Sequence, residues 1–304
     1  MIRSTKELSC EYLREFLEEY EYPGEAIESL LSDLKTLMSS DEARVGINAL
    51  LLEYRDESYD YLGSLSKAKG FFKIAGVGEY QGSFIFVAHL ASTMRELYAA
   101  QGIGYDIWFD TLMDLKYKAF ECILIHKVWG TFVAFWYKCF TEVRIVALGR
   151  LQFEKKLLGM VGTVKGIELR EDTPVLSVHI PTTGTPLDRE SFTKSYAMAI
   201  EFFKDSYFHG EPVKFYCGSW LLFPRLKEML KPTSNVVAFG SDYELIAERE
   251  NEDYKGTWRV FDCLITEDTD ISSLPEDNSM RRGYKKLMLA GEKTGIGVGV
   301  YIPD

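Results

Sequence analysis

The hydrophobic pattern of this 304-residue sequence changes near Glu142, and this change limits the folds that are open to the chain. Before Glu142, apolar residues recur every three or four positions, which is the period of an amphipathic helix. After it, apolar residues fall in short runs separated by Gly, Pro and Thr, which is typical of strands. The pattern predicts an α+β protein: an N-terminal helical bundle, residues 1–144, followed by a mixed β-sheet domain with flanking helices, residues 145–304.

The helical part has recognisable starts and breaks. Ser4 and Glu7 have the spacing of a capping box, which predicts a helix start at the N-terminus. Helices are expected before and after the Pro23-Gly24 break, from Asp41, over 82–101 and over 106–127. The most apolar stretch, 128–148, contains three charged residues. Their cost at membrane depth exceeds the gain from its apolar side chains, so a buried helix is predicted there rather than a membrane span.

The hydrophobic pattern of residues 145–304 predicts alternating strands and helices. Strands are expected over 146–154, 174–181, 212–222, 235–247, 257–265 and 296–302, and helices over 188–208, 224–231 and 279–290. Strand 174–181, helix 188–208 and strand 212–222 form a β-α-β unit, whose strands are parallel if both lie in one sheet. Four glycines near the end, Gly291, Gly295, Gly297 and Gly299, run into a terminal strand. They predict close backbone approach rather than a phosphate loop, which would precede a helix.

Polar residues alternate along three of the expected strands. Side chains at every second position of a strand share one face, which groups these residues into rows: Arg150, Gln152 and Glu154; Ser177 and His179; Cys217 and Ser219. If the strands are neighbours, the three rows are expected to converge on one surface. An apolar core of Leu176, Val178, Ile180, Trp220 and Leu222 would fill the space behind it.

Charge and composition exclude several classes of function. The net charge is −11, which repels phosphate backbones and anionic lipids, so neither a nucleic acid nor a membrane is an expected partner. The five cysteines are scattered singly and the first residues lack the apolar core of a signal peptide, so a cytoplasmic protein is expected. The histidines share no metal-ligand spacing, and no metal is expected. The sequence does not indicate an oligomeric state.

Two kinds of chemistry fit the polar rows. Glu154 has the features of a general base and His179 those of a proton relay, although a structural ion pair for Glu154 is an open alternative. Cys217 with His179 and Glu154 is the second possibility, a thiol nucleophile with its base and orienting acid, as in a hydrolase. Ser219 lacks the Gly-x-Ser-x-Gly elbow of serine hydrolases.

Four phrases occur in an order that resembles a bacterial acyltransferase-like family with an N-terminal helical domain and a GNAT-like C-terminal domain. They are Leu148-Gly149-Arg150-Leu151-Gln152-Phe153-Glu154, Val178-His179-Ile180-Pro181, Ser219-Trp220-Leu221-Leu222 and Ser234-Asn235. A tail from Arg281 to Gly291, then a Gly-rich strand, completes the order. The resemblance spans essentially the whole chain.

The resemblance implies transfer of an acyl group from acyl-CoA or acetyl-CoA to an amine of a small molecule or peptide. In GNAT proteins two strands splay apart to admit the pantetheine arm, and strands 174–181 and 212–222 fit those positions. The implied cofactor-binding residues are Val178 and Ile180 at the thioester, Thr182, Thr183, Gly184 and Arg189 at the pyrophosphate, and Ser219 on the next strand. The implied substrate-binding residues are Arg150, Gln152, Ser177 and Cys217. Tyr284, on the helix expected near the C-terminus, is a candidate acid for the departing thiolate beside Glu154 and His179 as catalytic residues, and a surface tyrosine without a catalytic role is the alternative.

The expected phosphate loop departs from the GNAT pattern. In place of Gln/Arg-x-x-Gly-x-Gly/Ala the chain has Pro181-Thr182-Thr183-Gly184-Thr185-Pro186-Leu187-Asp188-Arg189. The two prolines lack N–H groups, and Asp188 opposes an anion. A non-catalytic ligand-binding or scaffold protein on the same fold is therefore an alternative.

Overall fold

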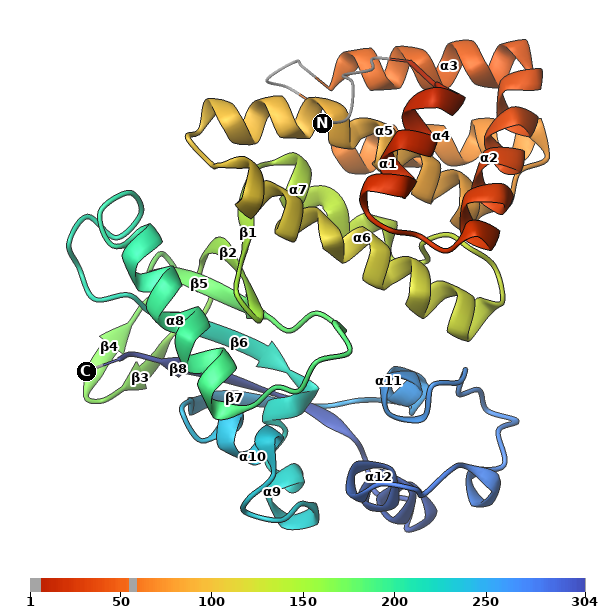
Figure 1. Ribbon diagram of the computed structural model, residues 1–304. Coiled ribbons are helices and arrows are strands. Elements are labelled where there is room, and N and C mark those ends of the chain that lie inside the picture. Colours follow the sequence, from red (N-terminus) through yellow and green to blue (C-terminus); the bar gives the residue numbers. More distant parts are fainter. Residues whose placement is uncertain (1–6, 55–58, 304) are drawn as a thin grey trace. The chain divides into compact units, whose positions relative to one another are not determined.

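The computed structural model describes residues 7–54 and 59–303, and the chain forms two compact units, Met1–Val146 and Ala147–Asp304 (Figure 1). The first unit is helical and the second contains a mixed sheet, so the predicted fold class is confirmed.

The helical unit is built around one central helix. Its elements are α1 (Cys10–Glu19), α2 (Gly24–Ser39), α3 (Asp41–Glu53), α4 (Tyr61–Ala75), α5 (Glu79–Ala100), α6 (Tyr105–His126), η1 (Ala134–Tyr137) and α7 (Lys138–Thr141). Every residue of α5 from Gly82 to Met94 is buried, as expected for a helix that is surrounded on all sides.

Two local predictions for this unit need revision. The capping box predicted at Ser4 lies outside the described residues, and α1 begins at Cys10 with Ser9 as its N-cap. The predicted buried helix over 128–148 is wrong, because the chain there forms η1, α7 and then a strand. Val143 has a positive φ of 51°, which ends the helical path before the first strand begins.

A buried histidine ties the start of α1 to α5. The Ser9 N–H donates to Nε2 of His89 at 3.1 Å, and Nδ1 of His89 lies 2.7 Å from the carbonyl oxygen of Ile85. These partners require a neutral ring with its proton on Nδ1. Burial lowers the pKa of His89 to about 4.

We expect His89 to make the stability of the helical unit depend on pH. An unfolded histidine takes up a proton near pH 6.5, whereas folded His89 takes one up only near pH 4, so the unfolded chain binds more protons between these values. The free energy of unfolding should therefore fall by about 3 kcal/mol more in the wild type than in His89→Gln between pH 7 and pH 4. Urea unfolding across this range measures the difference. Parallel curves for wild type and His89→Gln would refute the prediction.

The second unit contains one six-stranded sheet and a two-stranded hairpin among its described residues. The strands are β1 (Ile145–Leu148), β2 (Leu151–Leu157), β3 (Gly162–Val164), β4 (Ile167–Leu169), β5 (Pro174–His179), β6 (Phe215–Ser219), β7 (Glu244–Glu250) and β8 (Gly295–Tyr301). The large sheet has the order β1-β2-β5-β6-β8-β7, and β3 pairs with β4. β5 and β6 are parallel, as the β-α-β pattern predicts, while β2 and β8 pair antiparallel to their neighbours β5 and β6.

The helices of this unit are α8 (Arg189–Phe203), α9 (Arg225–Met229), α10 (Asn235–Gly240), α11 (Trp258–Phe261) and α12 (Ser279–Leu289), with 3₁₀ turns η2 (Trp220–Leu222), η3 (Lys255–Thr257) and η4 (Ile271–Ser273). The strand predicted over 257–265 is wrong, and the one over 235–247 is correct only from Glu244 onward. Both stretches are short apolar runs, which cannot be assigned by periodicity alone. Here they pack as helical turns, because Val260, Phe261 and Ile265 join a cluster with α12.

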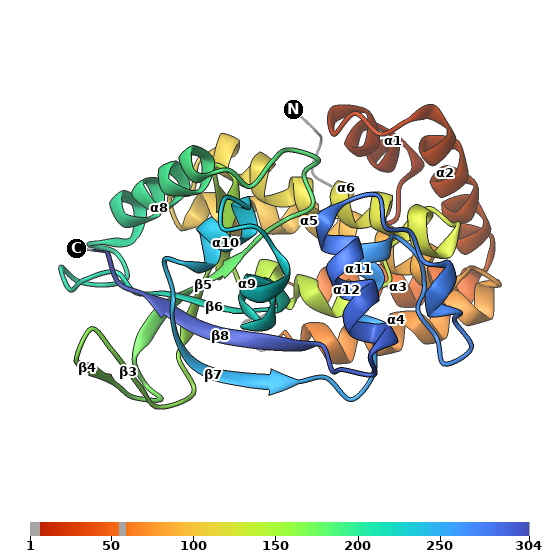
Figure 2. The same cartoon turned by 90° about the horizontal axis from the view of Figure 1, so that it is seen from below.

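The two faces of the sheet are covered differently. α8 lies across one face, where the ring of Tyr196 is 4.7 Å from that of Phe215 and 5.2 Å from that of Tyr301 (Figure 1 and Figure 2). On the other face, Val175 and Val300 pack against Val164 and Leu169 of the β3–β4 hairpin.

The glycines of β8 allow a close backbone approach. A Cβ at Gly297 would overlap the carbonyl group of Leu222, and one at Gly295 would overlap the Phe223 ring. A Cβ at Gly299 would lie 2.9 Å from that of Tyr243, so the expectation of close approach is correct for these three residues. Gly291 serves differently: its φ of 70° follows the end of α12 in the left-handed region.

Candidate active site

Four polar residues share one face of β2 and β5. The antiparallel register sets Gln152 opposite His179 and Glu154 opposite Ser177. Side chains opposite each other in such a pair lie on the same face. The alternation within each strand and the register between the two strands thus bring four of the predicted site residues together.

Glu154 and His179 form a pair across the two strands. Nε2 of His179 lies 3.0 Å from Oε2 of Glu154. Glu154 is buried, whereas the side chain of His179 is 27% exposed. In this arrangement the partly exposed imidazole can accept a proton from a bound molecule and pass one to the buried carboxylate.

The parallel pairing of β5 and β6 is short. It joins Leu176 to Phe215 and Ser177 to Tyr216, although β5 continues to His179 and β6 to Ser219. The strands therefore separate beside the last residues of β5. This is the divergence that the GNAT resemblance implies.

Cys217 and Ser219 do not join the polar row, which corrects the expectation that three rows share one surface. The parallel register sets Ser177 beside Tyr216, so Cys217 and Ser219 point to the opposite face, which α8 covers. Cys217 is 1% exposed, and burial raises the pKa of its thiol to about 12. The Cys217–His179–Glu154 arrangement of a hydrolase is therefore not formed, and a thiolate at Cys217 is disfavoured.

Arg150 holds the loop after β5. Its guanidinium group donates to three carbonyl oxygens of that loop: Pro181 at 2.9 Å, Thr185 at 3.2 Å and Pro186 at 3.4 Å. The backbone N–H of Arg150 donates to Oγ of Ser195 on α8 at 2.7 Å. Arg150 thus lies at the turn between β1 and β2 rather than in the row with Gln152 and Glu154.

The predicted phosphate-binding residues are partly engaged with other groups. Arg189 donates to both carboxylate oxygens of Asp242, at 2.7 and 2.8 Å, and to the carbonyl oxygen of Ala238. Oγ1 of Thr183 accepts from the Thr185 N–H at 3.2 Å and lies 2.7 Å from the Thr185 hydroxyl. Thr182 and Gly184 lie in the same loop, where Gly184 has a positive φ of 78°.

Asp188 closes the start of α8. Its carboxylate accepts from the Ser191 N–H at 2.8 Å, which places a negative charge at the helix N-terminus. This end of α8 is consequently less favourable for a phosphate than an uncapped helix start.

Tyr284 lies in the apolar cluster that α9, α11 and α12 form. It is 2% exposed, its hydroxyl has no hydrogen-bond partner among the described residues, and burial raises its pKa above the usual value. Its ring packs 5.9 Å from that of Trp220, which directly follows β6. A catalytic role for Tyr284 stays a prediction.

The core residues expected behind the row are mostly buried. Leu176, Val178 and Leu222 are buried, whereas Ile180 and Trp220 are partly exposed. Ile180 follows the end of β5, and Trp220 begins η2 rather than continuing the strand.

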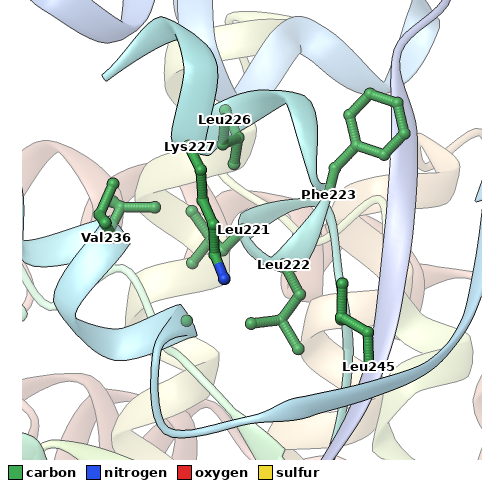
Figure 3. Close-up of a pocket in the computed structure, with 9 residues that line it drawn as sticks. Leu221, Leu222, Phe223, Leu226, Lys227, Val236 and Leu245 are labelled. Atoms are coloured by element: carbon green, nitrogen blue, oxygen red, sulfur yellow. The ribbon is translucent and has the colours of Figure 1, made fainter. Parts of the chain in front are cut away.

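A small apolar pocket lies apart from the polar row. It is lined by Leu221, Leu222, Phe223, Leu226, Lys227, Val236, Val237, Gly240 and Leu245. Figure 3 shows the Lys227 side chain among these aliphatic groups. None of the predicted site residues lines it, so we do not take it as the reaction site.

Residues 7–54 and 59–303 contain no cluster of His, Cys, Asp and Glu that could hold a metal ion. In the same ranges no helix combines the length and apolar character that crossing a membrane requires.

The sequence alone did not point to two residues that shape the site. Ser195 fixes the β1–β2 turn, and Asp242 holds Arg189, each from more than 40 residues away in the chain. No local pattern marks such distant partners. Tyr216 was also missed, because the register that sets it beside Ser177 depends on how β5 and β6 pair and not on the alternation within either strand.

Comparison with known proteins agrees with this architecture. Residues 11–143 match the family model of the N-acyltransferase N-terminal domain, and residues 145–301 match that of the GNAT-like C-terminal domain. No curated protein matches the chain.

Three similar solved structures cover nearly the whole chain. An acyltransferase in complex with decanoyl-CoA and teicoplanin has a TM-score of 0.68 at 20% identity, covering 99% of this chain and 90% of that one. An acyltransferase mutant in complex with octanoyl-CoA has a TM-score of 0.70 at 20% identity, with the same coverage. An acyltransferase in complex with CoA and 10C-teicoplanin has a TM-score of 0.68 at 21% identity, covering 96% and 88%.

At these identities the solved structures show a shared fold, and the two family matches together account for almost every residue from 11 to 301. The chain belongs to the acyltransferase-like family in which an N-acyltransferase N-terminal domain is joined to a GNAT-like C-terminal domain.

Proposed function

We propose that the protein transfers an acyl group from an acyl-CoA thioester to an amine of a small molecule or peptide. The observation that carries the proposal is the Glu154–His179 pair beside the point where β5 and β6 stop pairing. The family match and the similar structures, which hold decanoyl-CoA, octanoyl-CoA or CoA, support an acyl-CoA donor.

The donor would enter where the two strands separate. In this arrangement the backbone at Val178 and Ile180 contacts the thioester carbonyl, and Ser219 lies on the strand across the gap. Hydrogen bonds to that carbonyl oxygen would stabilise the negative charge that develops on it in the transition state.

The acceptor amine would approach over the face that carries the polar row. Its nitrogen attacks the thioester carbon, and the proton that it loses passes through His179 to Glu154. The C–S bond then breaks, and the departing thiolate takes up a proton. Tyr284 is the proposed donor of that proton, although burial raises the pKa of its phenol and so makes it a weaker acid than a free tyrosine.

The phosphate end of the donor would be held more weakly than in most GNAT proteins. Thr182, Thr183 and Gly184 are the proposed contacts. Arg189 would contribute mainly by fixing the start of α8, because its guanidinium group is paired with Asp242. We therefore assign more of the donor affinity to the thioester arm and acyl chain than to the pyrophosphate.

A coupled assay tests the proposal. Incubation with octanoyl-CoA and hexylamine should release free CoA thiol and form octanoyl hexylamide in equal amounts, measured by a thiol reagent and by mass spectrometry. Isothermal titration with acetyl-CoA and octanoyl-CoA should show binding. Absence of heat with both at millimolar concentration would refute the acyl-CoA donor.

A second candidate is a ligand-binding or scaffold protein that retains the fold without the reaction. The negative charge of Asp188 at the start of α8 favours it. It predicts binding of octanoyl-CoA without release of thiol in the presence of amines, so the same assay distinguishes the two functions.

A further inference from the structure

Gln152 has an unusual environment for a buried side chain. It is 1% exposed, and its Oε1 has no hydrogen-bond partner among the described residues. A buried acceptor without a donor costs about 1–3 kcal/mol, and such groups are rare in folded proteins. An orphan of this kind requires an explanation, and at a face that carries a Glu–His pair we take the explanation to be a bond to a ligand.

The position of Gln152 indicates which ligand supplies the donor. Gln152 lies on β2, directly opposite His179 of β5 and two residues from Glu154 on the same face. β6, and with it the gap for the donor arm, lies on the other side of β5. Neighbouring strands are about 4.8 Å apart, so Gln152 is one strand farther from the gap than His179. A molecule bound over the polar face of β2 and β5 would therefore lie nearer to Gln152 than one inserted beside β6.

We infer that Gln152 accepts an N–H of the acceptor amine and so selects primary amines; this inference rests on the proposed function. A neutral primary amine has two N–H bonds. One proton leaves toward His179 and Glu154 as the N–C bond forms and the C–S bond breaks. The other N–H remains in the amide product and donates to Oε1 of Gln152 throughout the reaction.

Secondary amines and alcohols fail this requirement. Each has a single N–H or O–H, and the reaction removes that proton. Gln152 would then lose its donor as the transition state forms, which penalises these acceptors. The carboxamide is therefore a positioning residue that sets acceptor specificity.

The test compares hexylamine with N-methylhexylamine in the wild type and in Gln152→Met. Methionine has a similar length but no strong acceptor, so the space for the amine is retained. We expect kcat/KM for hexylamine to fall about 10-fold, the preference for hexylamine over N-methylhexylamine to fall by a similar factor, and KM for octanoyl-CoA to stay the same. Gln101→Met, an exposed change at the end of α5, is the matched control and should leave the preference unaltered.

Thermal unfolding of the ligand-free protein gives an independent readout. If Gln152 waits for a ligand, Gln152→Met removes an unsatisfied polar group, and the unfolding midpoint should stay the same or rise. A lower midpoint would show that Gln152 has a structural partner and would overturn the inference. An unchanged amine preference in an active Gln152→Met protein would also overturn it, while leaving the proposed function intact. Failure of the wild type to release thiol with either amine would remove the proposed function, and the inference with it.

Discussion

Replacing Glu154 by Gln is expected to lower kcat for acyl transfer to hexylamine by about 10²–10⁴-fold, the range that general-base catalysis contributes. The amide of Gln retains the size of the side chain and its contact with the His179 ring. It cannot take up the proton that the amine loses. The loss should therefore appear in kcat, while the dissociation constant for octanoyl-CoA stays close to that of the wild type.

The matched control for this change is Glu168→Gln, an exposed carboxylate on β4 of the same unit, which should leave kcat unaltered. His179→Ala should reduce kcat to a similar extent. The double variant should be little worse than either single variant, because the two side chains act in one proton path. Additive losses, or a kcat for Glu154→Gln near the wild-type value in a folded protein, would contradict the assignment.

Replacing Gly297 by Ala is expected to destabilise the sheet unit by about 3 kcal/mol or more. The new Cβ would overlap the carbonyl group of Leu222, a backbone group that cannot rotate away as the end of a side chain can. Either η2 must move or β8 must leave its register with β6, in which Gly297 is paired with Ser219. Soluble yield and urea unfolding of the purified variant measure the effect.

Gly256→Ala provides the comparison. It adds the same methyl group in the same unit, at a residue where no atom lies within 4 Å of the Cβ position. This variant should unfold within about 0.5 kcal/mol of the wild type. Equal stability of Gly297→Ala and Gly256→Ala would show that the approach of β8 to η2 is not tight.

The sequence predicts the central part of this fold well, because strong local patterns coincide there with the tertiary structure. Residues 174–181 and 212–222 are apolar runs joined by one amphipathic helix, and they form the parallel pair β5–β6. The alternation of Gln152 and Glu154 likewise places them on one face of β2, and the register of β2 with β5 brings His179 to the same face.

The sequence does not determine which side chains of β5 and β6 share a face of the sheet. Alternation assigns Ser177 and Cys217 each to a row, but it does not say which rows of two strands face the same way. That depends on register, and a shift of one residue reverses the face. The sequence contains no signal for this register, so the placement of Cys217 and Ser219 beside His179 was wrong.

The strand predictions for the regions around α10 and α11 were wrong for another reason. Apolar runs of four to eight residues suit both a buried strand and a short buried helix, and only their tertiary partners decide between the two. For α11 the partner is α12. For α10 it is α8, where the ring of Phe192 lies 5.5 Å from that of Phe239.

The three contacts from Arg150 to the loop 181–186 determine how the loop responds to substitution. The guanidinium group of Arg150 fixes the path of the loop by hydrogen bonds to backbone carbonyl oxygens. Every amino acid has such an oxygen, whatever its side chain. Replacing side chains inside the loop is therefore expected to displace it less than replacing Arg150. The conformation of the loop thus depends on one side chain outside it, at the connection between β1 and β2.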